Sequence, residues 1–333
     1  MKTSQPHLRP RPPTGSTPTS DPPGAASRGA TTPEGVPPRR ALSPAARRHL
    51  TGWLFIGPVV LGVIAFQFVP VAVSGFASLT DWNGMTSPHF KGVSNYVTLF
   101  TEDPLFYVTL KNTLVFTLGS IVLTIALGLA LALLANQPIR GISIFRAAFF
   151  TPVVTNVVAV GFVWFWLYRP GDGLFDGLLG LVGVDGPAWL ADAHWALLAV
   201  ILVAVWQGVG YPMVILLSGL QAIPPSLYEA ARVDGASSWT RFWRITLPLL
   251  TPQLFFLTIM QFITSFQVFG IIYVMTHGGP GDATSVYIYQ VYQVAFSQGK
   301  FGYASAMGWV LFAIVGLVTW AQMRLEKRWV FYG

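Results

Sequence analysis

Long apolar stretches without charged residues alternate with short polar segments along most of the chain. Six stretches contain no Asp, Glu, Lys, Arg or His, and they cover residues 53–79, 112–135, 147–168, 195–223, 253–275 and 302–323. Each is longer than the ~20 residues that an α-helix needs to cross about 30 Å of hydrocarbon. Helices are expected because lipid offers the backbone no hydrogen-bond partners. The pattern predicts an all-α, polytopic membrane protein with six transmembrane helices.

Four prolines fall within these runs. Pro58, Pro152 and Pro212 are expected to kink their helices, because proline has no backbone N–H to donate. Pro70 is expected either to kink the first helix or to mark its outer end.

The first 46 residues have a different character from the rest. They contain 11 prolines with many Ser, Thr and Gly residues. Such a segment cannot bury enough apolar surface to offset its chain entropy. It is not a signal peptide, because the first apolar run starts only at Trp53. We predict a disordered cytoplasmic tail over residues 1–46 and a membrane domain over residues 47–333.

The distribution of positive charge predicts the orientation in the membrane. Sixteen of the 20 Lys and Arg residues lie in the N-terminal tail, the loops 136–146 and 224–252, and the C-terminus. The positive-inside rule places these segments, and therefore both termini, in the cytoplasm. The net charge of +7 is thus a topology signal. Nucleic-acid binding is not expected, because the basic residues are not gathered on one folded face.

Composition narrows the function classes. Only 10% of residues are charged, against about 25% in soluble domains, and there is no cysteine for a disulfide or a thiolate metal site. The six runs lack the ionisable groups that proton-driven carriers need at depth, although sodium coupling through carbonyl oxygens stays open. The same absence argues against a membrane-embedded hydrolase.

The chain has no recognisable ATP site. Its only Gly-Lys pair, Gly299-Lys300, is followed by Phe301, whereas a P-loop requires Ser or Thr at that place. We therefore expect a translocation subunit rather than an enzyme. If transport is driven uphill, ATP and Mg²⁺ would be bound by a partner chain.

The loop 224–252 is unusually elaborate for a connector. Ser226 and Glu229 fit a capping box that would start a short helix. Gly235 can close that helix in the left-handed conformation. Ser237 or Ser238 can cap a second short helix. The loop is either a well-capped connector or a projecting element that docks into a partner.

The residues of this loop follow a known pattern. They are Glu229-Ala230-Ala231, Asp234-Gly235-Ala236, Phe242, Ile245, Leu247-Pro248 and Pro252. The pattern resembles the EAA loop of ABC-importer permeases. Five other stretches resemble the carbohydrate branch of that family, the maltose- and glycerol-phosphate-type permeases. They are residues 76–82 (FASLTDW), 92–96 (GVSNY), 111–113 (KNT), 276–280 (THGGP) and 302–307 (GYASAM).

This resemblance implies a bacterial plasma-membrane importer subunit that works with other chains. The expected partners are a second permease, two ATPase subunits and an extracytoplasmic sugar-binding protein. Glu229 would meet a basic residue of the ATPase, Ala230 would permit close packing, and Gly235 would make the turn, while Ala231 would belong to the same ATPase-coupling set. Asp234 would brace the loop, for example to an arginine. His277 and Gly270 depart from the family pattern, so the resemblance does not define the sugar.

A sugar path needs aromatic faces and uncharged hydrogen-bonding groups. The fifth run places Phe262, Phe266, Phe269 and Tyr273 on one helical stripe. The residues that we expect along the path are Gln207, Tyr211, Gln261, Phe262, Ser265 and Phe266. Helix packing is the competing interpretation of the stripe, and hydrogen bonding between helices is that of the polar residues.

Two alternative functions remain. The chain could be a self-sufficient secondary carrier or channel for small polar solutes. It could also be a membrane scaffold whose loop recruits a partner without transport.

Overall fold

The computed structural model describes residues 44–331, and side chains over 52–327 and 330–331. The first 43 residues of the predicted tail lie outside this range. Helix α1 (Pro44–Val63) includes the last three residues of the predicted tail. The chain divides into two compact units, Met1–Val60 and Leu61–Gly333, and the arrangement below is that of the second unit.

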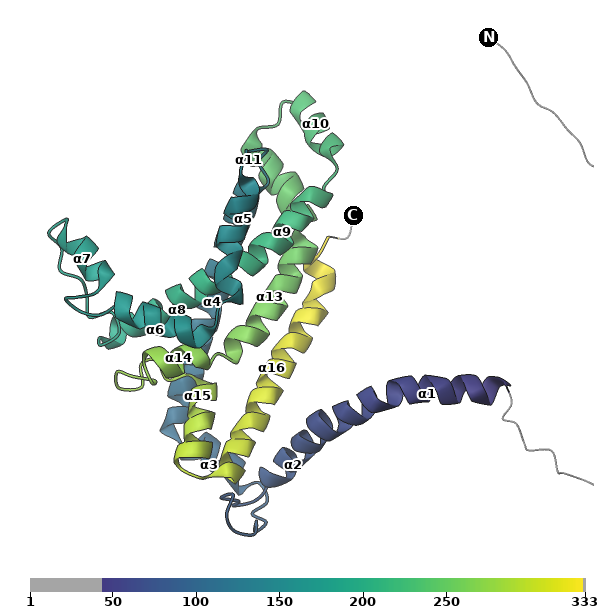
Figure 1. Cartoon of the computed structure of the whole chain (residues 1–333), viewed down its shortest axis with the longest axis vertical. Helices are drawn as coiled ribbons and strands as arrows, with labels where there is room; N and C mark the ends of the chain where they lie inside the picture. Colours follow the sequence, from purple (N-terminus) through teal and green to yellow (C-terminus); the bar gives the residue numbers. More distant parts are fainter. Residues whose placement is uncertain (1–43, 332–333) are drawn as a thin grey trace, which may run out of the picture. The chain divides into compact units, whose positions relative to one another are not determined.

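Helices make up the described part, in which no β-strand forms and a single bridge joins Thr80 to Phe90 (Figure 1). The first half contains η1 (Ile64–Phe68), α2 (Val69–Ala77), α3 (Ser94–Thr101), α4 (Pro104–Ala135), α5 (Ile142–Phe150), η2 (Thr151–Val154), α6 (Val157–Leu167) and α7 (Leu174–Gly180). The second half contains α8 (Ala193–Gly208), α9 (Gly210–Ala222), α10 (Pro225–Val233), α11 (Ser238–Arg241), η3 (Phe242–Thr246), α12 (Leu247–Leu249), α13 (Thr251–Phe266), α14 (Gly270–Met275), α15 (Tyr287–Tyr292), η4 (Gln293–Ser297) and α16 (Phe301–Trp329). The all-α prediction is confirmed.

Three continuous helices are long and apolar enough to cross a membrane. They cover Gly52–Ala77, Pro104–Ala135 and Phe301–Lys327. Three further helix pairs pass the same test together but are bent, so the described residues hold up to six spans if each pair counts as one. The bends are 101° between η2 and α6, 47° between α8 and α9, and 63° between α12 and α13.

The first span does not end at Pro70. Helix α2 continues to Ala77, and a π-helical stretch, Ile64–Phe68, precedes the proline. Wider turns of this kind absorb the loss of a regular hydrogen bond, because the proline has no N–H to donate to the previous turn. Pro70 therefore perturbs the helix without terminating it.

Helix α4 is the central element of the second unit and packs against α8, α9, α13 and α15. Asp103 caps its start, since the carboxylate accepts from the amide of Leu105 at 2.9 Å, and Pro104 occupies the first turn. Gly128 lies where α4 crosses α9, and a Cβ there would stand 2.8 Å from Cβ of Pro212. The close crossing therefore depends on a residue without a side chain.

Local residues explain the bends in the third and fourth runs. Asn156 is extended (φ −67°, ψ 126°), and its side chain accepts from the amide of Val158 at 2.8 Å, which starts α6 as a new helix. In the fourth run the turn at Val209 comes three residues before Pro212. The predicted kink at Pro212 thus agrees with the structure, and Pro152 lies in the 3₁₀ turn before Asn156.

The predicted fifth span is interrupted. Helix α13 ends at Phe266, and the chain re-enters a helix only at Gly270. The interruption lets α14 pack closely on α6 through two glycines. A Cβ at Gly270 would lie 3.0 Å from Val157, and one at Gly161 would lie 2.9 Å from Val274. The predicted stripe from Phe262 to Tyr273 is therefore not on one continuous helix.

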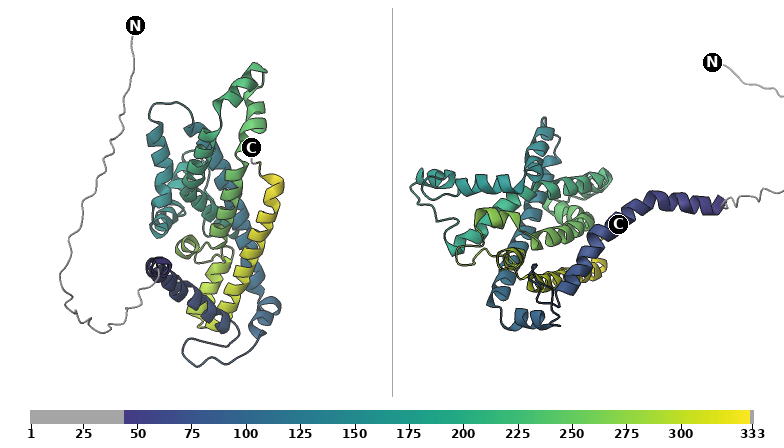
Figure 2. Two further views of the ribbon diagram at one scale, coloured as in Figure 1. Left: turned by 90° about the vertical axis from the view of Figure 1, so that its right-hand side faces the viewer. Right: turned by 60° about the horizontal axis from the view of Figure 1, so that its bottom comes forward.

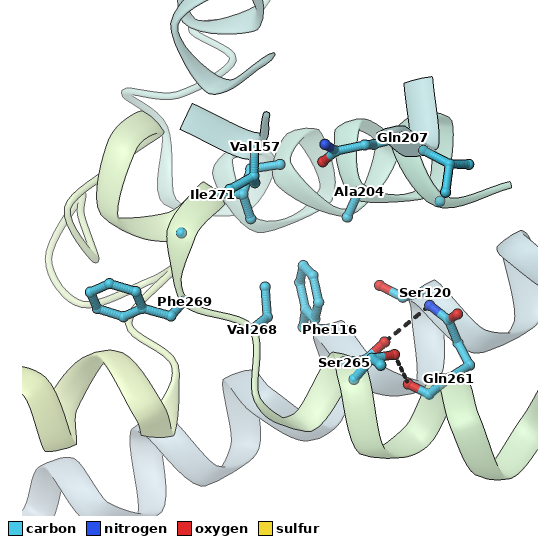
Figure 3. Close-up of a pocket in the computed structure, with 14 residues that line it drawn as sticks. Phe116, Ser120, Val157, Ala204, Gln207, Gln261, Ser265, Val268, Phe269 and Ile271 are labelled. Carbon is cyan, nitrogen blue, oxygen red and sulfur yellow. Dashed lines mark hydrogen bonds between the residues drawn. The ribbon is translucent and has the colours of Figure 1, made fainter. Parts of the chain in front are cut away.

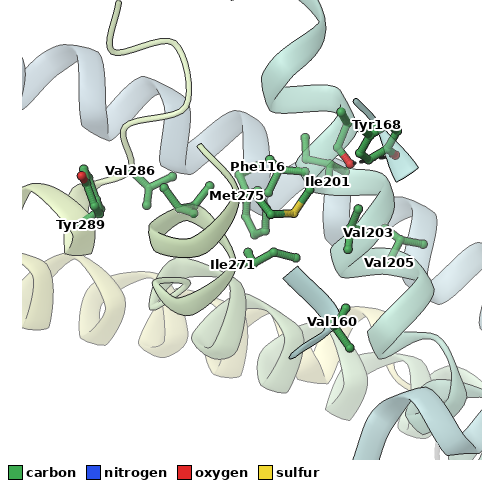
Figure 4. Close-up of a cluster of buried hydrophobic side chains, with 13 residues drawn as sticks. Phe116, Val160, Tyr168, Ile201, Val203, Val205, Ile271, Met275, Val286 and Tyr289 are labelled. Carbon is green, nitrogen blue, oxygen red and sulfur yellow. Dashed lines mark hydrogen bonds between the residues drawn. The ribbon is translucent and has the colours of Figure 1, made fainter. Parts of the chain in front are cut away.

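Buried apolar side chains form three clusters. Figure 4 shows the first, in which Phe116 of α4 packs with Val203 of α8 and with Ile271 and Met275 of α14. The second surrounds Phe266 and Tyr287, and the third joins the C-terminal end of α4 to α9 and to the first half of α13. The clusters link every long helix of the unit to α4 or α13.

Opposite ends of the second unit carry different features. Helices α10 and α11 lie at one end, and the C-terminal end of α16 points the same way (Figure 1 and the left view of Figure 2). Helix α3 and the start of α16 lie at the other end. The loop 224–252 and the basic end of α16 therefore share one side, as the charge distribution predicts.

Candidate functional site

The loop 224–252 folds as two short helices joined by a tight turn. Helix α10 begins at Pro225, which suits the first helical position because its fixed φ is helical and its missing N–H would have no partner there. Pro224 precedes it as the capping residue. Ser226 consequently lies within the first turn and does not cap the helix, so the predicted capping box is wrong.

The turn between the helices is closed by Gly235. Its φ of 75° is left-handed, as predicted for a residue that ends a helix. The amide of Ala236 donates to Ala231 at 2.8 Å, and that of Gly235 donates to Arg232 at 3.1 Å. This pair of bonds is the Schellman arrangement, which satisfies the last carbonyls of α10. The turn is rigidly defined by its own backbone.

The second helix is capped and anchored by side chains. Ser237 Oγ accepts from the amide of Thr240 at 3.2 Å, which confirms one of the two predicted caps. The Tyr228 hydroxyl of α10 hydrogen-bonds Thr246 Oγ1 of η3 at 2.9 Å. This bond ties the two helices together. Trp239 and Trp243 take no part in this bond, and both side chains remain exposed.

The predicted coupling residues lie on the free surface of the loop. Glu229, Ala230, Asp234 and Gly235 are exposed, and Ala231 is half-buried. The predicted bracing of Asp234 is absent, because none of the ion pairs in the described residues joins it to an arginine. Arg241 instead donates to Ser238 Oγ at 2.9 Å. The acidic groups of the loop are thus available to a partner.

A cleft of about 350 Å³ lies between the bent spans (Figure 3). It is lined by residues from α4, η2, α6, α8, α13 and α14. Three of the predicted path residues, Gln207, Gln261 and Ser265, line it together. No described residue lining the cleft carries a formal charge, so it suits a neutral polar solute.

Hydrogen bonds orient the polar groups of the cleft. Gln261 Nε2 donates to Ser265 Oγ at 3.2 Å, and Gln207 Nε2 donates to the carbonyl of Thr155 at 3.2 Å. Ser120 Oγ is buried without a partner in the structure. An unpaired buried hydroxyl is costly, so a polar ligand in the cleft would relieve that cost.

The other predicted path residues lie elsewhere. Phe262 and Phe266 are buried in the second apolar cluster, where Phe266 is 0% exposed. Tyr211 is exposed at 39% and does not line the cleft. For the two phenylalanines the structure shows helix packing, the competing interpretation of the stripe.

Sequence reasoning missed several residues of the cleft, among them Phe116 and Ser120, whereas Phe269 was already part of the predicted stripe. A usable signal was the row of hydroxyls that begins just before the second run and continues into it. They are Thr109, Thr113, Thr117, Ser120 and Thr124. All five are buried on one side of α4. Their spacing of three or four residues places them on one helical face.

Other chemistry finds little support in the described residues. No group of three or more His, Cys, Asp or Glu residues within residues 44–331 could hold a metal ion.

In the polar loop between α2 and α3, the backbone amide of His89 donates to Asp81 Oδ1 at 2.9 Å. This hydrogen bond holds the pKa of Asp81 below its ordinary value. Asp81 therefore stays ionised at neutral pH, as suits a group in water.

Comparison with known proteins agrees with this architecture. The family model described as "Binding-protein-dependent transport system inner membrane component" matches residues 124–330. The probable ABC transporter permease protein YesP of Bacillus subtilis is 38% identical over 288 residues, which cover 85% of this chain and 93% of the relative. The multiple sugar-binding transport system permease protein MsmF of Streptococcus mutans is 38% identical over 279 residues, covering 83% and 95%.

A solved structure shares the fold. It is a bacterial alginate ABC transporter in complex with an alginate pentasaccharide-bound periplasmic protein. The TM-score is 0.76 at 22% identity, and the match covers 86% of this chain and 97% of the other.

These findings define a permease of the binding-protein-dependent class. The chain belongs to the family of binding-protein-dependent transport system inner membrane components.

Proposed function

We propose that this chain is one permease subunit of an ATP-driven importer that translocates a sugar or oligosaccharide. The observation that carries the proposal is the exposed, self-capped helix pair of residues 224–252 on a bundle with an uncharged polar cleft. A self-sufficient carrier would have no use for such a loop. A scaffold would have no use for the cleft.

The shape of the loop favours energy coupling to a separate ATPase. The Schellman turn at Gly235 and the Tyr228–Thr246 bond make α10 and η3 one stiff unit. A stiff unit transmits displacement, whereas a flexible connector would absorb it. Glu229 and Asp234 on its surface supply negative charge for a basic site on the partner. In this proposal the partner ATPase pair binds ATP and Mg²⁺.

The cleft favours a neutral polyhydroxylated substrate. Carboxamides and hydroxyls from Gln207, Gln261 and Ser265 can exchange hydrogen bonds with sugar hydroxyls, while Phe116 and Phe269 offer ring faces. The relative MsmF is a multiple sugar-binding transport permease, and LacF of Rhizobium radiobacter, 33% identical, is a lactose transport permease. Their substrates belong to the class that the cleft suits.

Similarity to binding-protein-dependent importers supports the remaining partners. A second permease is expected to complete the pathway. An extracytoplasmic binding protein would deliver the substrate to the end that carries α3. Both termini and the loop 224–252 would face the cytoplasm, in agreement with the positive-inside rule.

Uptake in a defined system tests this function. The complete assembly would be purified and reconstituted into proteoliposomes with ATP inside and the loaded binding protein outside. Lactose, raffinose and maltotriose serve as labelled probes. We expect ATP-dependent uptake of at least one of them. Uptake that persists without ATP, or without the binding protein, would support a self-sufficient carrier instead.

Replacement of Gln261 by Leu is expected to slow uptake. The side chain keeps its size but loses its hydrogen bonds, which are worth about 1 kcal/mol or roughly a fivefold change. Initial uptake rates in the same proteoliposomes provide the measurement. Gln221→Leu is the control, because Gln221 is exposed on α9 outside the cleft. Equal rates for the two variants would remove Gln261 from the path.

A further inference from the structure

Aromatic rings after the interruption of the fifth run form a continuous contact network. We call Phe269, Tyr273, His277, Tyr292 and Phe296 the aromatic ladder. Phe269 stacks on Tyr273 with ring centroids 5.3 Å apart, and Tyr273 contacts His277 at 5.6 Å. Phe269, Tyr273 and His277 form one row, and Tyr292 and Phe296 form a second row with ring centroids 5.2 Å apart. Tyr292 joins the two rows, because its ring centroid lies 5.1 Å from that of Phe269.

The end of α13 is what creates the ladder. On a continuous helix Phe269 and Tyr273 would extend the buried stripe that contains Phe262 and Phe266. The break at residues 267–269 instead turns them toward α15 and η4, where Tyr292 and Phe296 lie. Two rows of rings from separate helices are thereby brought side by side.

The ladder is an open surface. Phe296 is 68% exposed and Tyr273 is 40% exposed, while His277 is also exposed and Phe269 and Tyr292 are half-buried. The Phe269–Tyr273 and Tyr292–Phe296 pairs are tilted by 27° and 34° from parallel, Tyr273–His277 by 47°, and Tyr273–Tyr292 by 81°. The exposure of Phe296 and Tyr273 leaves ring surface open to a ligand.

One end of the ladder is part of the cleft. Phe269 lines it and lies at the opposite end from Gln207 and Gln261 (Figure 3). The other end, Phe296, contacts Phe301 at the start of α16, at 5.7 Å. That part of α16 lies at the end of the unit opposite α10 and α11 (Figure 1). The ladder thus connects the cleft with the proposed extracytoplasmic end.

Polar groups accompany the rings. Gln293 Nε2 donates to the Tyr289 hydroxyl at 2.8 Å beside the ladder, and Ser297 Oγ donates to Gln293 Oε1. The ladder itself contributes two phenol groups and an imidazole. By contrast, the exposed side chains of Phe162, Val163 and Phe165 on α6 carry no hydrogen-bonding group. Ring faces combined with hydrogen-bonding groups are suited to a pyranose, which has apolar C–H faces and a polar rim.

We propose that the aromatic ladder is a stacking track along which the pyranose rings of the substrate pass between the extracytoplasmic end and the cleft. This inference rests on the proposed sugar-import function. Stacking on successive faces provides many weak, equivalent positions. Such positions favour movement, because no single one holds the sugar tightly.

A double variant tests the track in the reconstituted full assembly. Tyr273→Ala/Tyr292→Ala removes two ring faces, and the matched control Tyr273→Phe/Tyr292→Phe keeps the faces but removes the hydroxyls. The probe is whichever of lactose, raffinose and maltotriose the wild-type assembly takes up fastest. Uptake, ATPase stimulation by the loaded binding protein, and subunit composition are all measured.

We expect the alanine pair to lower uptake roughly tenfold while binding-protein stimulation of the ATPase and the subunit composition stay as in wild type. The phenylalanine pair should retain more than half of the wild-type rate. Wild-type uptake by the alanine pair, an equal loss in the phenylalanine pair, or loss of a partner subunit would each overturn the track. Absence of uptake by the wild-type assembly itself would instead overturn the proposed function, and the track with it.

Discussion

Replacing Glu229 by Lys is expected to abolish sugar uptake while leaving the chain correctly inserted in the membrane. Glu229 is exposed on α10, where in our proposal it meets a basic residue of the ATPase. Reversing one partner of an interfacial charge pair costs about 2–5 kcal/mol, so uptake should fall by at least tenfold. The measurements are uptake in proteoliposomes and the amount of ATPase that co-purifies with the tagged chain.

The control for this variant reverses an acidic residue at the other end of the molecule. Glu102 is also exposed, but it lies at the end of α3, far along the chain from the loop 224–252. Glu102→Lys should retain the ATPase. Normal uptake by Glu229→Lys at wild-type membrane levels would show that this residue has no part in coupling.

A leucine at Gly128 should strongly destabilise the transmembrane domain. A Cβ at this position would lie 2.8 Å from Cβ of Pro212 and 3.2 Å from the backbone nitrogen of Met213. A backbone atom cannot move aside as a flexible side chain can, so α4 and α9 would have to separate. Overpacking of this kind costs about 3 kcal/mol, or roughly 5–10 °C in the midpoint of thermal unfolding. Size-exclusion chromatography of heated, detergent-solubilised protein measures that midpoint.

Gly316 on α16 provides the matched comparison. A Cβ there would have no atom within 4 Å. Gly316→Leu should therefore unfold within about 2 °C of the wild type. If both leucine variants unfold at the same temperature, the α4–α9 crossing does not depend on Gly128.

The loop 224–252 was largely predictable because its structure is determined locally. Gly235 and Ser237 act on neighbouring backbone groups, so residue type and spacing are sufficient to place them. Ser226 shows the limit of this reasoning. Its motif fitted a capping box that would start the helix at Leu227, yet the helix starts two residues earlier at Pro225, because proline is preorganised for that position.

The cleft was only partly predictable because it depends on contacts between distant parts of the chain. Gln207, Gln261 and Ser265 could be selected by their polarity within apolar runs. The sequence could not predict that Phe262 and Phe266 lie on a different helix from Tyr273, with Phe269 in the break between them. A stripe read from a hydropathy pattern assumes one unbroken helix. The break accompanies close packing between α14 and α6 through Gly270 and Gly161, and contacts between such distant residues are not visible in a hydropathy pattern.

The central claim is that this chain works as a permease within a larger, ATP-driven assembly. The most direct test is to purify the tagged full-length chain from its native membrane in a mild detergent and to identify the proteins that remain bound by mass spectrometry. We predict a separate ATPase and a second, different permease in stoichiometric amounts. Recovery of the chain alone, or only as a homo-oligomer, across several detergents would contradict the claim.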